Sequence, residues 1–273
     1  MKYIVAVDLE GIHGVVGRAG EKLRRGLDTH AEAAENAVKE INALCEALFV
    51  AGETEVLLWD NHGLGDNLDY EKLKGNVTIA DWRKYPYRME FLKEHDCKGI
   101  FYLGYHAKAG TLGVLSHTYS SSDVQYYKFN GKAVGEFEID SMLAAEYGIA
   151  PYFAAADDVA TAQMQAFCPH LTCVTTKIAK GRNQAELFGA EAVLAAIQAG
   201  AKKALQQTHT PTKVQFPLQA EFRFSTVEMA CDWKHNLENV LTNGVEFGED
   251  CNVVKATLLN FAELKTFLRG RAF

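Results

Sequence analysis

Apolar and polar positions follow two repeating patterns along the first 207 residues. Short runs rich in β-branched and aromatic residues predict buried strands at 3–7, 55–59, 77–80, 100–103, 152–156 and 172–176. Between them, apolar residues at helical spacing predict helices at 30–50, 138–147 and 184–206, and a fourth that Asp157 or Asp158 caps and that ends at Phe167. Strands that alternate with helices predict an α/β fold, a layered core with a largely parallel sheet.

The pattern changes after residue 207. Residues 208–217 are polar and contain two prolines, so we expect a linker there. Apolar and polar residues then alternate from 219 to 224, which predicts a half-exposed antiparallel strand, and a strand at 253–258 and a closing helix at 261–268 follow. The sequence therefore predicts two domains, an α/β domain at 1–207 and a small C-terminal α+β domain at 208–273.

Two carboxylates follow the first predicted strand directly. Asp8 and Glu10 are two positions apart, so their side chains point to the same side of an extended chain. Side by side they repel each other unless a cation lies between them, and the carboxyl ends of strands are where open α/β sheets bind ligands. We interpret the pair as metal ligands; the alternative is a solvated turn after an edge strand.

Three further potential ligands come after other strands. His62 follows the strand at 55–59 and His106 follows the strand at 100–103, while Glu136 follows a hairpin with the Asn-Gly turn signature at 126–134. With Asp8 and Glu10 these make three carboxylates and two imidazoles, a set suited to two zinc ions that share a bridging carboxylate. Nitrogen ligands disfavour magnesium and calcium. Each residue alone has an ordinary explanation, such as a hydrogen-bonded turn histidine.

Composition excludes several classes of function. The 273 residues are 48% hydrophobic and 23% charged with a net charge of −7, which argues against a nucleic-acid partner. The densest basic group, at 22–25, is expected to be a solvated face. We find no apolar run of about 18 residues and no CxxC among six cysteines, so we expect a soluble, cytoplasmic protein that binds no membrane. Dinucleotide, Walker, HExxH and GxSxG motifs are also absent.

Five short blocks, in this order over about the first 200 residues, resemble the DppA-type D-aminopeptidases. The blocks are Val7-Asp8-Leu9-Glu10-Gly11-Ile12, Asp60-Asn61-His62, Leu103-Gly104-Tyr105-His106-Ala107, Gly113-Val114-Leu115-Ser116-His117 and Val134-Gly135-Glu136. The resemblance implies a dinuclear zinc peptidase that removes N-terminal D-amino acids, D-alanine especially, from short peptides.

The resemblance also implies roles for single residues. Asp8 would bridge the two ions, Glu10 and His106 would share one ion, and His62 and Glu136 would share the other. His117 would be the catalytic residue. The family forms a decameric ring, so a homo-oligomer is implied, with the C-terminal domain helping to build it.

Two positions depart from the family pattern. Asn61 stands where a small hydroxyl residue is common, and His13 stands where a small residue is common. Asp60 is open to two readings, because it could orient a ligand imidazole or cap a turn.

For the mechanism we expect water activated by the metals, with His117 either as the base that takes its proton or as a direct nucleophile. Two other functions stay open. One is another dinuclear-metal amidohydrolase or phosphoesterase, although no basic channel for phosphate is evident. The other is a non-catalytic oligomeric binding protein, which the cost of burying clustered charges without metal disfavours.

Overall fold

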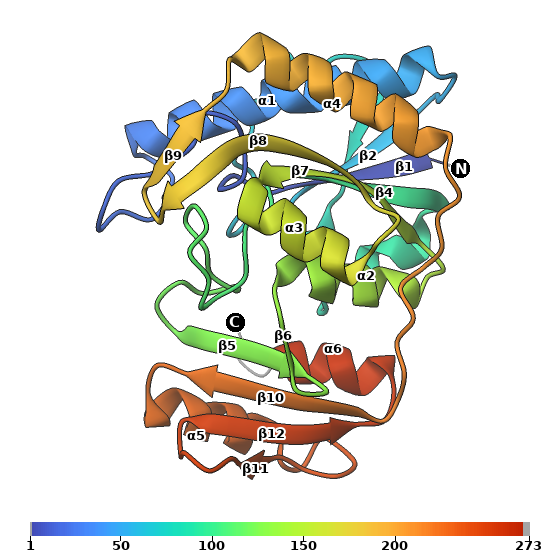
Figure 1. The fold of residues 1–273 in the computed structure, drawn as a ribbon. Helices are drawn as coiled ribbons and strands as arrows, with labels where there is room; N and C mark the ends of the chain where they lie inside the picture. The colour runs from blue at the N-terminus through green and yellow to red at the C-terminus, as the bar shows by residue number, and fades with distance from the viewer. Residues whose placement is uncertain (1, 270–273) are drawn as a thin grey trace.

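Seven strands form the larger of two sheets in a computed structural model that describes residues 2–269 (Figure 1). Their order is β3-β2-β1-β4-β7-β8-β9, and every neighbouring pair is parallel except β8 and β9. The predicted α/β fold with a largely parallel sheet is confirmed. The strands are β1 (Lys2–Val7), β2 (Val56–Asp60), β3 (Val77–Ile79), β4 (Cys97–Leu103), β7 (Ala150–Asp157), β8 (Thr172–Gly181) and β9 (Gln184–Leu187).

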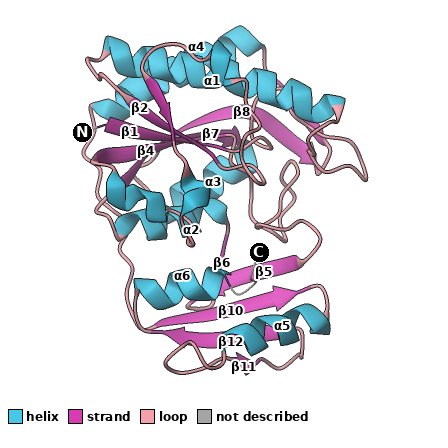
Figure 2. Cartoon of the chain, turned by 180° about the vertical axis from the view of Figure 1, so that it is seen from behind, coloured by secondary structure: helices cyan, strands magenta, loops and turns pink. Residues whose placement is uncertain are grey.

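Helices cover both faces of this sheet. Figures 1 and 2 show α1 (Asp28–Val50) and α4 (Ala190–Leu205) on one face, and α2 (Glu136–Ala145) and α3 (Asp158–Phe167) on the other. Because both faces are buried, β1 reads as a continuous apolar run rather than as an alternation. Its side chains nevertheless divide between two cores: Val5 and Val7 pack toward α1 and α4, and Ile4 and Ala6 pack on the opposite side.

A second, antiparallel sheet lies below the first in Figure 1. Its order is β11-β12-β10-β5-β6, and α5 (Val227–Leu237) and α6 (Phe261–Arg269) accompany it. The predicted hairpin forms β5 and β6 and completes this sheet, so the boundary expected between residues 207 and 208 does not separate the two sheets. The strands are β5 (Val124–Phe129), β6 (Lys132–Val134), β10 (Leu218–Phe224), β11 (Glu246–Phe247) and β12 (Val253–Leu258).

The core on the α2 side of the large sheet is shared by both sheets. Phe222 of β10 and Phe267 of α6 lie in the same cluster of buried residues as Ile4 of β1, and the rings of Phe222 and Phe267 are 4.5 Å apart. Lys265 of α6 contacts Glu146 at the end of α2 at 2.9 Å. The second sheet is therefore packed onto the first through α2 and α6.

Two predicted helices differ from the structure at their N-terminal ends, and several short elements were not predicted. The helix expected from residue 184 begins at Ala190, because β8 continues to Gly181 and turns back as β9. Helix α2 begins at Glu136, two residues earlier than expected, with Gly135 before it. The short helix α5 and three 3₁₀ segments were not predicted; these segments are η1 (Tyr70–Lys72), η2 (Trp82–Lys84) and η3 (Glu90–Glu94).

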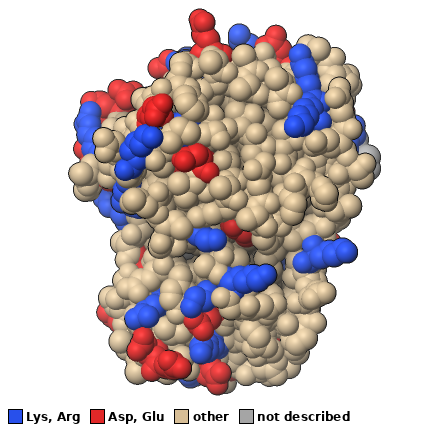
Figure 3. Space-filling view, in the orientation of Figure 1, with Lys and Arg blue, Asp and Glu red and all other residues tan. Residues whose placement is uncertain are grey.

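The surface of the described chain carries mixed charge. Basic and acidic side chains are interspersed over the face drawn in Figure 3. No helix within residues 2–269 combines the length and the apolar composition that a membrane crossing requires.

Candidate metal centre and its cleft

Three neighbouring strands bring the predicted ligands to one edge of the large sheet. Asp8 and Glu10 follow β1, His62 follows β2, and His106 follows β4. Strands β2 and β4 flank β1 on opposite sides, so the order in which strands are added to the sheet reverses at β1. Open α/β sheets bind ligands at such a switch point. Glu136 joins the group as the first residue of α2.

Two glycines allow the loops after β1 and β4 to touch. The backbone N–H of Gly11 donates to the carbonyl of Gly104 at 2.6 Å, and Asp8 N–H donates to Leu103 O at 2.9 Å. A Cβ on Gly104 would lie 2.0 Å from the carbonyl oxygen of Asp8, and Gly104 has a φ of +70°. Only glycine fits both the contact and the left-handed backbone, so Gly104 keeps Asp8 close to His106.

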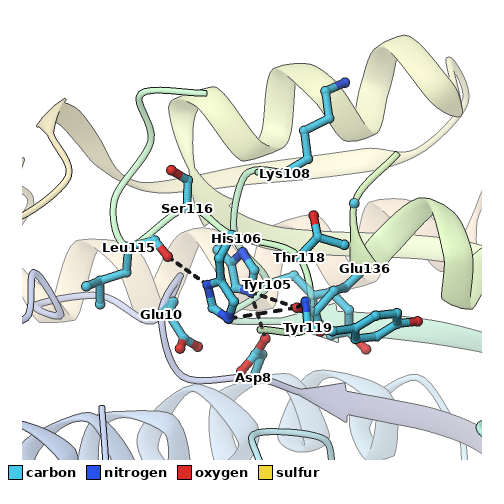
Figure 4. A network of polar contacts seen from close by, with 12 residues as sticks. Asp8, Glu10, Tyr105, His106, Lys108, Leu115, Ser116, Thr118, Tyr119 and Glu136 are labelled. Carbon is cyan, nitrogen blue, oxygen red and sulfur yellow. Dashed lines mark hydrogen bonds and ion pairs between the residues drawn. The ribbon is translucent and has the colours of Figure 1, made fainter. Parts of the chain in front are cut away.

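Asp8 lies between the two predicted ligand imidazoles. Its Oδ1 is 3.0 Å from His62 Nδ1, and its Oδ2 is 3.4 Å from His106 Nε2. Figure 4 shows Asp8 directed at the centre of the group. With one oxygen toward each imidazole and only 4% of its surface exposed, Asp8 has the placement of a bridging ligand.

The other two carboxylates flank this pair. Glu10 Oε2 is 3.2 Å from His62 Nδ1, and Glu136 Oε1 is 3.3 Å from His106 Nε2. Ligand atoms of Asp8, Glu10 and His106 also lie within 4.8 Å of one another. All five predicted ligands are thus brought together. The short contacts pair Glu10 with His62 and Glu136 with His106. The resemblance implied Glu10 with His106 and His62 with Glu136, and that pairing stays a prediction.

Each imidazole is held through one nitrogen by a backbone carbonyl. His62 Nε2 donates to Leu23 O at 2.8 Å, and His106 Nδ1 donates to Ala107 O at 3.1 Å. This arrangement is typical of metal-ligating histidines, because it fixes the tautomer and leaves the other nitrogen free. His106 Nε2 is buried and makes no hydrogen bond to any residue between 2 and 269, so the donor set fits a metal ion at this place.

The charges in the centre depend on one another. Burial alone would raise the pKa of Asp8, but the adjacent His106 and His62 hold that pKa well below its usual range. Burial alone would lower the pKa of His62, but Glu10 and Asp8 raise it to about 12. The carboxylates therefore stabilise positive charge at this point, as a metal site requires.

His117, the predicted catalytic residue, lies beside these ligands. Its ring stacks on His106 with centroids 4.0 Å apart, and its Nε2 is 3.9 Å from Glu136 Oε1. His117 Nδ1 donates to Leu115 O at 2.8 Å. Burial first, and then the neighbouring His106, lower the pKa of His117. Both effects favour the neutral imidazole, whose Nε2 can accept a proton.

The centre opens into a cleft of about 270 Å³. Several of its lining residues were not predicted, because they come from loops whose sequence carries no periodic pattern. The basic group at 22–25, expected to be a solvated face, contributes Lys22 and Arg24 to the cleft. Leu23, between them, supplies the carbonyl for His62. The unpredicted lining residues include Arg88, Tyr119 and Arg182.

The structure gives different surroundings to Asp60, Asn61 and His13, the three residues whose roles the sequence left open. Asp60 accepts hydrogen bonds from Asn67 N at 2.6 Å and Asn67 Nδ2 at 2.8 Å, so it fixes the turn after β2 and makes no hydrogen bond to His62. Asn61 lines the cleft and donates to Tyr105 OH at 3.0 Å. His13 is buried against Glu40 at 2.9 Å, away from the residues that line the cleft.

The sequence as a whole matches a known protein family. The profile of the D-aminopeptidase family, Peptidase_M55, matches residues 1–251, and the chain belongs to this family. The predicted family resemblance is thereby confirmed.

A protein sequence and a solved structure, both of a D-aminopeptidase from Bacillus subtilis, are similar to the chain. The D-aminopeptidase of strain 168 is 30% identical over 182 residues, a match that spans 65% of this chain and 64% of the relative. The solved structure of the Zn-dependent D-aminopeptidase DppA, described as a self-compartmentalizing protease, superposes with a TM-score of 0.84. It is 23% identical and covers 98% of this chain and 95% of that chain, so this likeness is one of fold.

Proposed function

We propose that this protein is a zinc-dependent aminopeptidase that releases N-terminal D-amino acids, D-alanine first, from short peptides. The observation that carries the proposal is Asp8 set between two fixed imidazoles, with His117 next to Glu136. Membership of the D-aminopeptidase family supports the reaction. The Zn-dependent relative of the same fold supports the metal.

Two zinc ions per chain would be held by Asp8 as the bridge together with the other four predicted ligands. When bound, zinc supplies a Lewis acid that polarises a carbonyl and makes water acidic enough to lose a proton near neutral pH. The ligand set is Asp8, Glu10, His62, His106 and Glu136.

His117 would move the proton in this reaction. Its Nε2 accepts a proton from the attacking water and returns it to the leaving amine, while the hydrogen bond from Nδ1 to Leu115 O holds the ring. Glu136, 3.9 Å from Nε2, stabilises the imidazolium that forms between the two transfers. The cleft volume of about 270 Å³ suits a short peptide better than a folded protein.

We also propose a homo-oligomer, with a decameric ring as the specific form. The related structure is described as self-compartmentalizing, which requires several copies around a closed space. Two large apolar side chains stand out on loops near the centre: Leu64, 80% exposed, follows His62, and Leu112, 70% exposed, precedes His117. Contact between copies would cover them.

The decisive experiment measures free D-alanine released from D-alanyl-D-alanine, beside the L,L dipeptide, with zinc-loaded and chelator-treated protein. Zinc-dependent cleavage of the D,D form alone supports reaction, stereochemistry and metal together. Absence of cleavage with metal still bound would discard the substrate and turn attention to other amides. Absence of both metal and cleavage would favour the binding protein.

A further inference from the structure

The geometry points to Arg88 as the residue that binds the free C-terminal carboxylate of a dipeptide substrate. This inference rests on the proposed function and names the kind of peptide that the cleft selects. It concerns a residue outside the predicted ligand set, which reaches the cleft from the segment between η2 and η3.

The Arg88 guanidinium is fixed in place by its neighbours. Its Nε and Nη2 donate to the two oxygens of Asp140 at 2.5 and 2.8 Å. The rings of Trp59 and Tyr119 lie against it, each with its centroid 4.9 Å from Cζ. Tyr105 OH donates to the same Asp140 at 2.8 Å and fixes that carboxylate in turn. A charged group held this way loses little conformational entropy when it binds a ligand.

One edge of the guanidinium is left for a ligand. Asp140 engages two of the three nitrogens, and Nη1 has no hydrogen-bond partner among residues 2–269. Arg88 lines the same cleft as His117, and 22% of its side chain is exposed. An arginine nitrogen in a partly dry cleft is a strong donor to a carboxylate.

The position of Arg88 relative to Glu136 sets which part of the substrate it meets. Glu136 Oε1 faces His106 and His117, whereas Glu136 Oε2 lies 3.7 Å from Arg88 Nη2. Figure 4 shows Glu136 beside His106 and Tyr119. Arg88 is thus separated from the reacting atoms by the width of one carboxylate and a contact of 3.7 Å. One residue of extended chain spans about 3.5 Å and a charged hydrogen bond adds about 2.8 Å, so the terminal carboxylate of a dipeptide can reach Arg88 from the scissile carbonyl.

The other cations of the cleft are less suited to this role. Lys22 and Arg24 are exposed, and Lys22 Nζ bonds Ser122 Oγ at 3.0 Å. Arg182 donates to the carbonyl of Ser116. All three side chains are exposed and attract anionic peptides to the cleft, whereas Arg88 is held by two hydrogen bonds to a buried carboxylate.

The test compares three substrates with zinc-loaded protein: D-alanyl-D-alanine, its C-terminal amide, and the D-alanine tripeptide, in which the carboxylate lies one residue farther away. We expect kcat/KM for the dipeptide to exceed that for the other two by roughly 10–100-fold, which is the factor that the free energy of one charged hydrogen bond corresponds to. Equal cleavage of all three overturns the carboxylate site and leaves the peptidase standing. Cleavage of none overturns the proposed function and this inference with it.

The Arg88→Lys variant keeps the charge opposite Asp140 and removes the bidentate geometry. We expect its KM for the dipeptide to rise roughly 10–100-fold while KM for the amide stays within about threefold. Thermal midpoint and zinc per chain establish that the variant is folded, and Arg83→Lys, exposed on η2 outside the cleft lining, is the matched control. Equal losses of kcat for acid and amide would overturn the inference, because Arg88 would then act through Glu136. The substrate comparison decides the question if the variant does not fold.

Discussion

Lys177 of β8 donates through Nζ to the backbone carbonyls of Glu10 and Ile12, at 2.7 Å each. The side chain is fully buried, and burial lowers the pKa of Lys177 to about 8. Thr176, the preceding residue, donates to Gly11 O at 2.7 Å. Strand β8 therefore holds the loop that carries two of the five proposed ligands.

The first prediction follows from this contact. Lys177→Met leaves the carbonyls of Glu10 and Ile12 without their donor, so the loop loosens and Glu10 loses its fixed direction. We expect zinc affinity to fall roughly 10–100-fold, as it does when the support of a ligand is removed. Competition with a chromophoric chelator measures it. The control is Lys180→Met, an exposed lysine of the same strand that pairs with Glu186; equal affinity losses in both variants would contradict the prediction.

The second prediction separates catalysis from metal binding. His117→Ala should lower kcat by about 10²–10⁴-fold and leave zinc content unchanged, because Nε2 moves the proton while other side chains hold the ions. His106→Ala, which removes the buried Nε2 between Asp8 and Glu136, should lose zinc as well as activity. Zinc analysis beside steady-state kinetics distinguishes the two. Zinc loss in the His117 variant would make His117 a ligand instead.

The third prediction concerns Asp8. Asp8→Asn keeps the shape of the side chain and removes the charge that both imidazoles face. Zinc at 100 times its dissociation constant stabilises a folded protein by about 2.7 kcal/mol. We expect added zinc to raise the thermal midpoint of the chelator-treated wild type and to have little effect on the variant. An equal rise in both proteins would exclude Asp8 as the bridging ligand.

The fourth prediction tests the contact between the loops after β1 and β4. Gly104→Ala places a Cβ 2.0 Å from Asp8 O at a φ of +70°, and it should lower the free energy of unfolding by more than about 3 kcal/mol. Gly110→Ala is the matched control, because its φ is +81° but open space surrounds its Cβ position. The control should cost about 1–2 kcal/mol, the backbone penalty alone. Urea unfolding of both variants measures the difference, and equal costs would show that the contact is not tight.

Much of the centre could be predicted because strand ends are visible in a sequence. Asp8, His62 and His106 each follow an apolar run, and the carboxyl ends of parallel strands meet at one edge. Their partners could not be found this way. Arg88 contacts Glu136, 48 positions later, and Lys177 contacts Glu10, 167 positions earlier. No local periodicity in a sequence indicates contacts between residues so far apart.

The second sheet shows a different limit of sequence patterns. The hairpin at 126–134 was predicted, but the pattern of a half-exposed strand does not name its partner. In the fold, β5 pairs with β10, about 90 residues later, so a segment from the middle of the chain completes the C-terminal sheet. The helix expected from residue 184 begins only at Ala190 for a related reason, since residues 184–187 form β9 by pairing with β8.

That hairpin also connects the metal centre to the second sheet, because Gly135 alone separates the end of β6 from Glu136. A ligand joined so closely to an edge strand follows that strand when it moves. Partial opening of the second sheet would release Glu136 from the centre, so this sheet and the bound zinc should be lost in one cooperative step. The stability of the second sheet should therefore contribute to zinc affinity, although the other four proposed ligands follow strands of the first sheet.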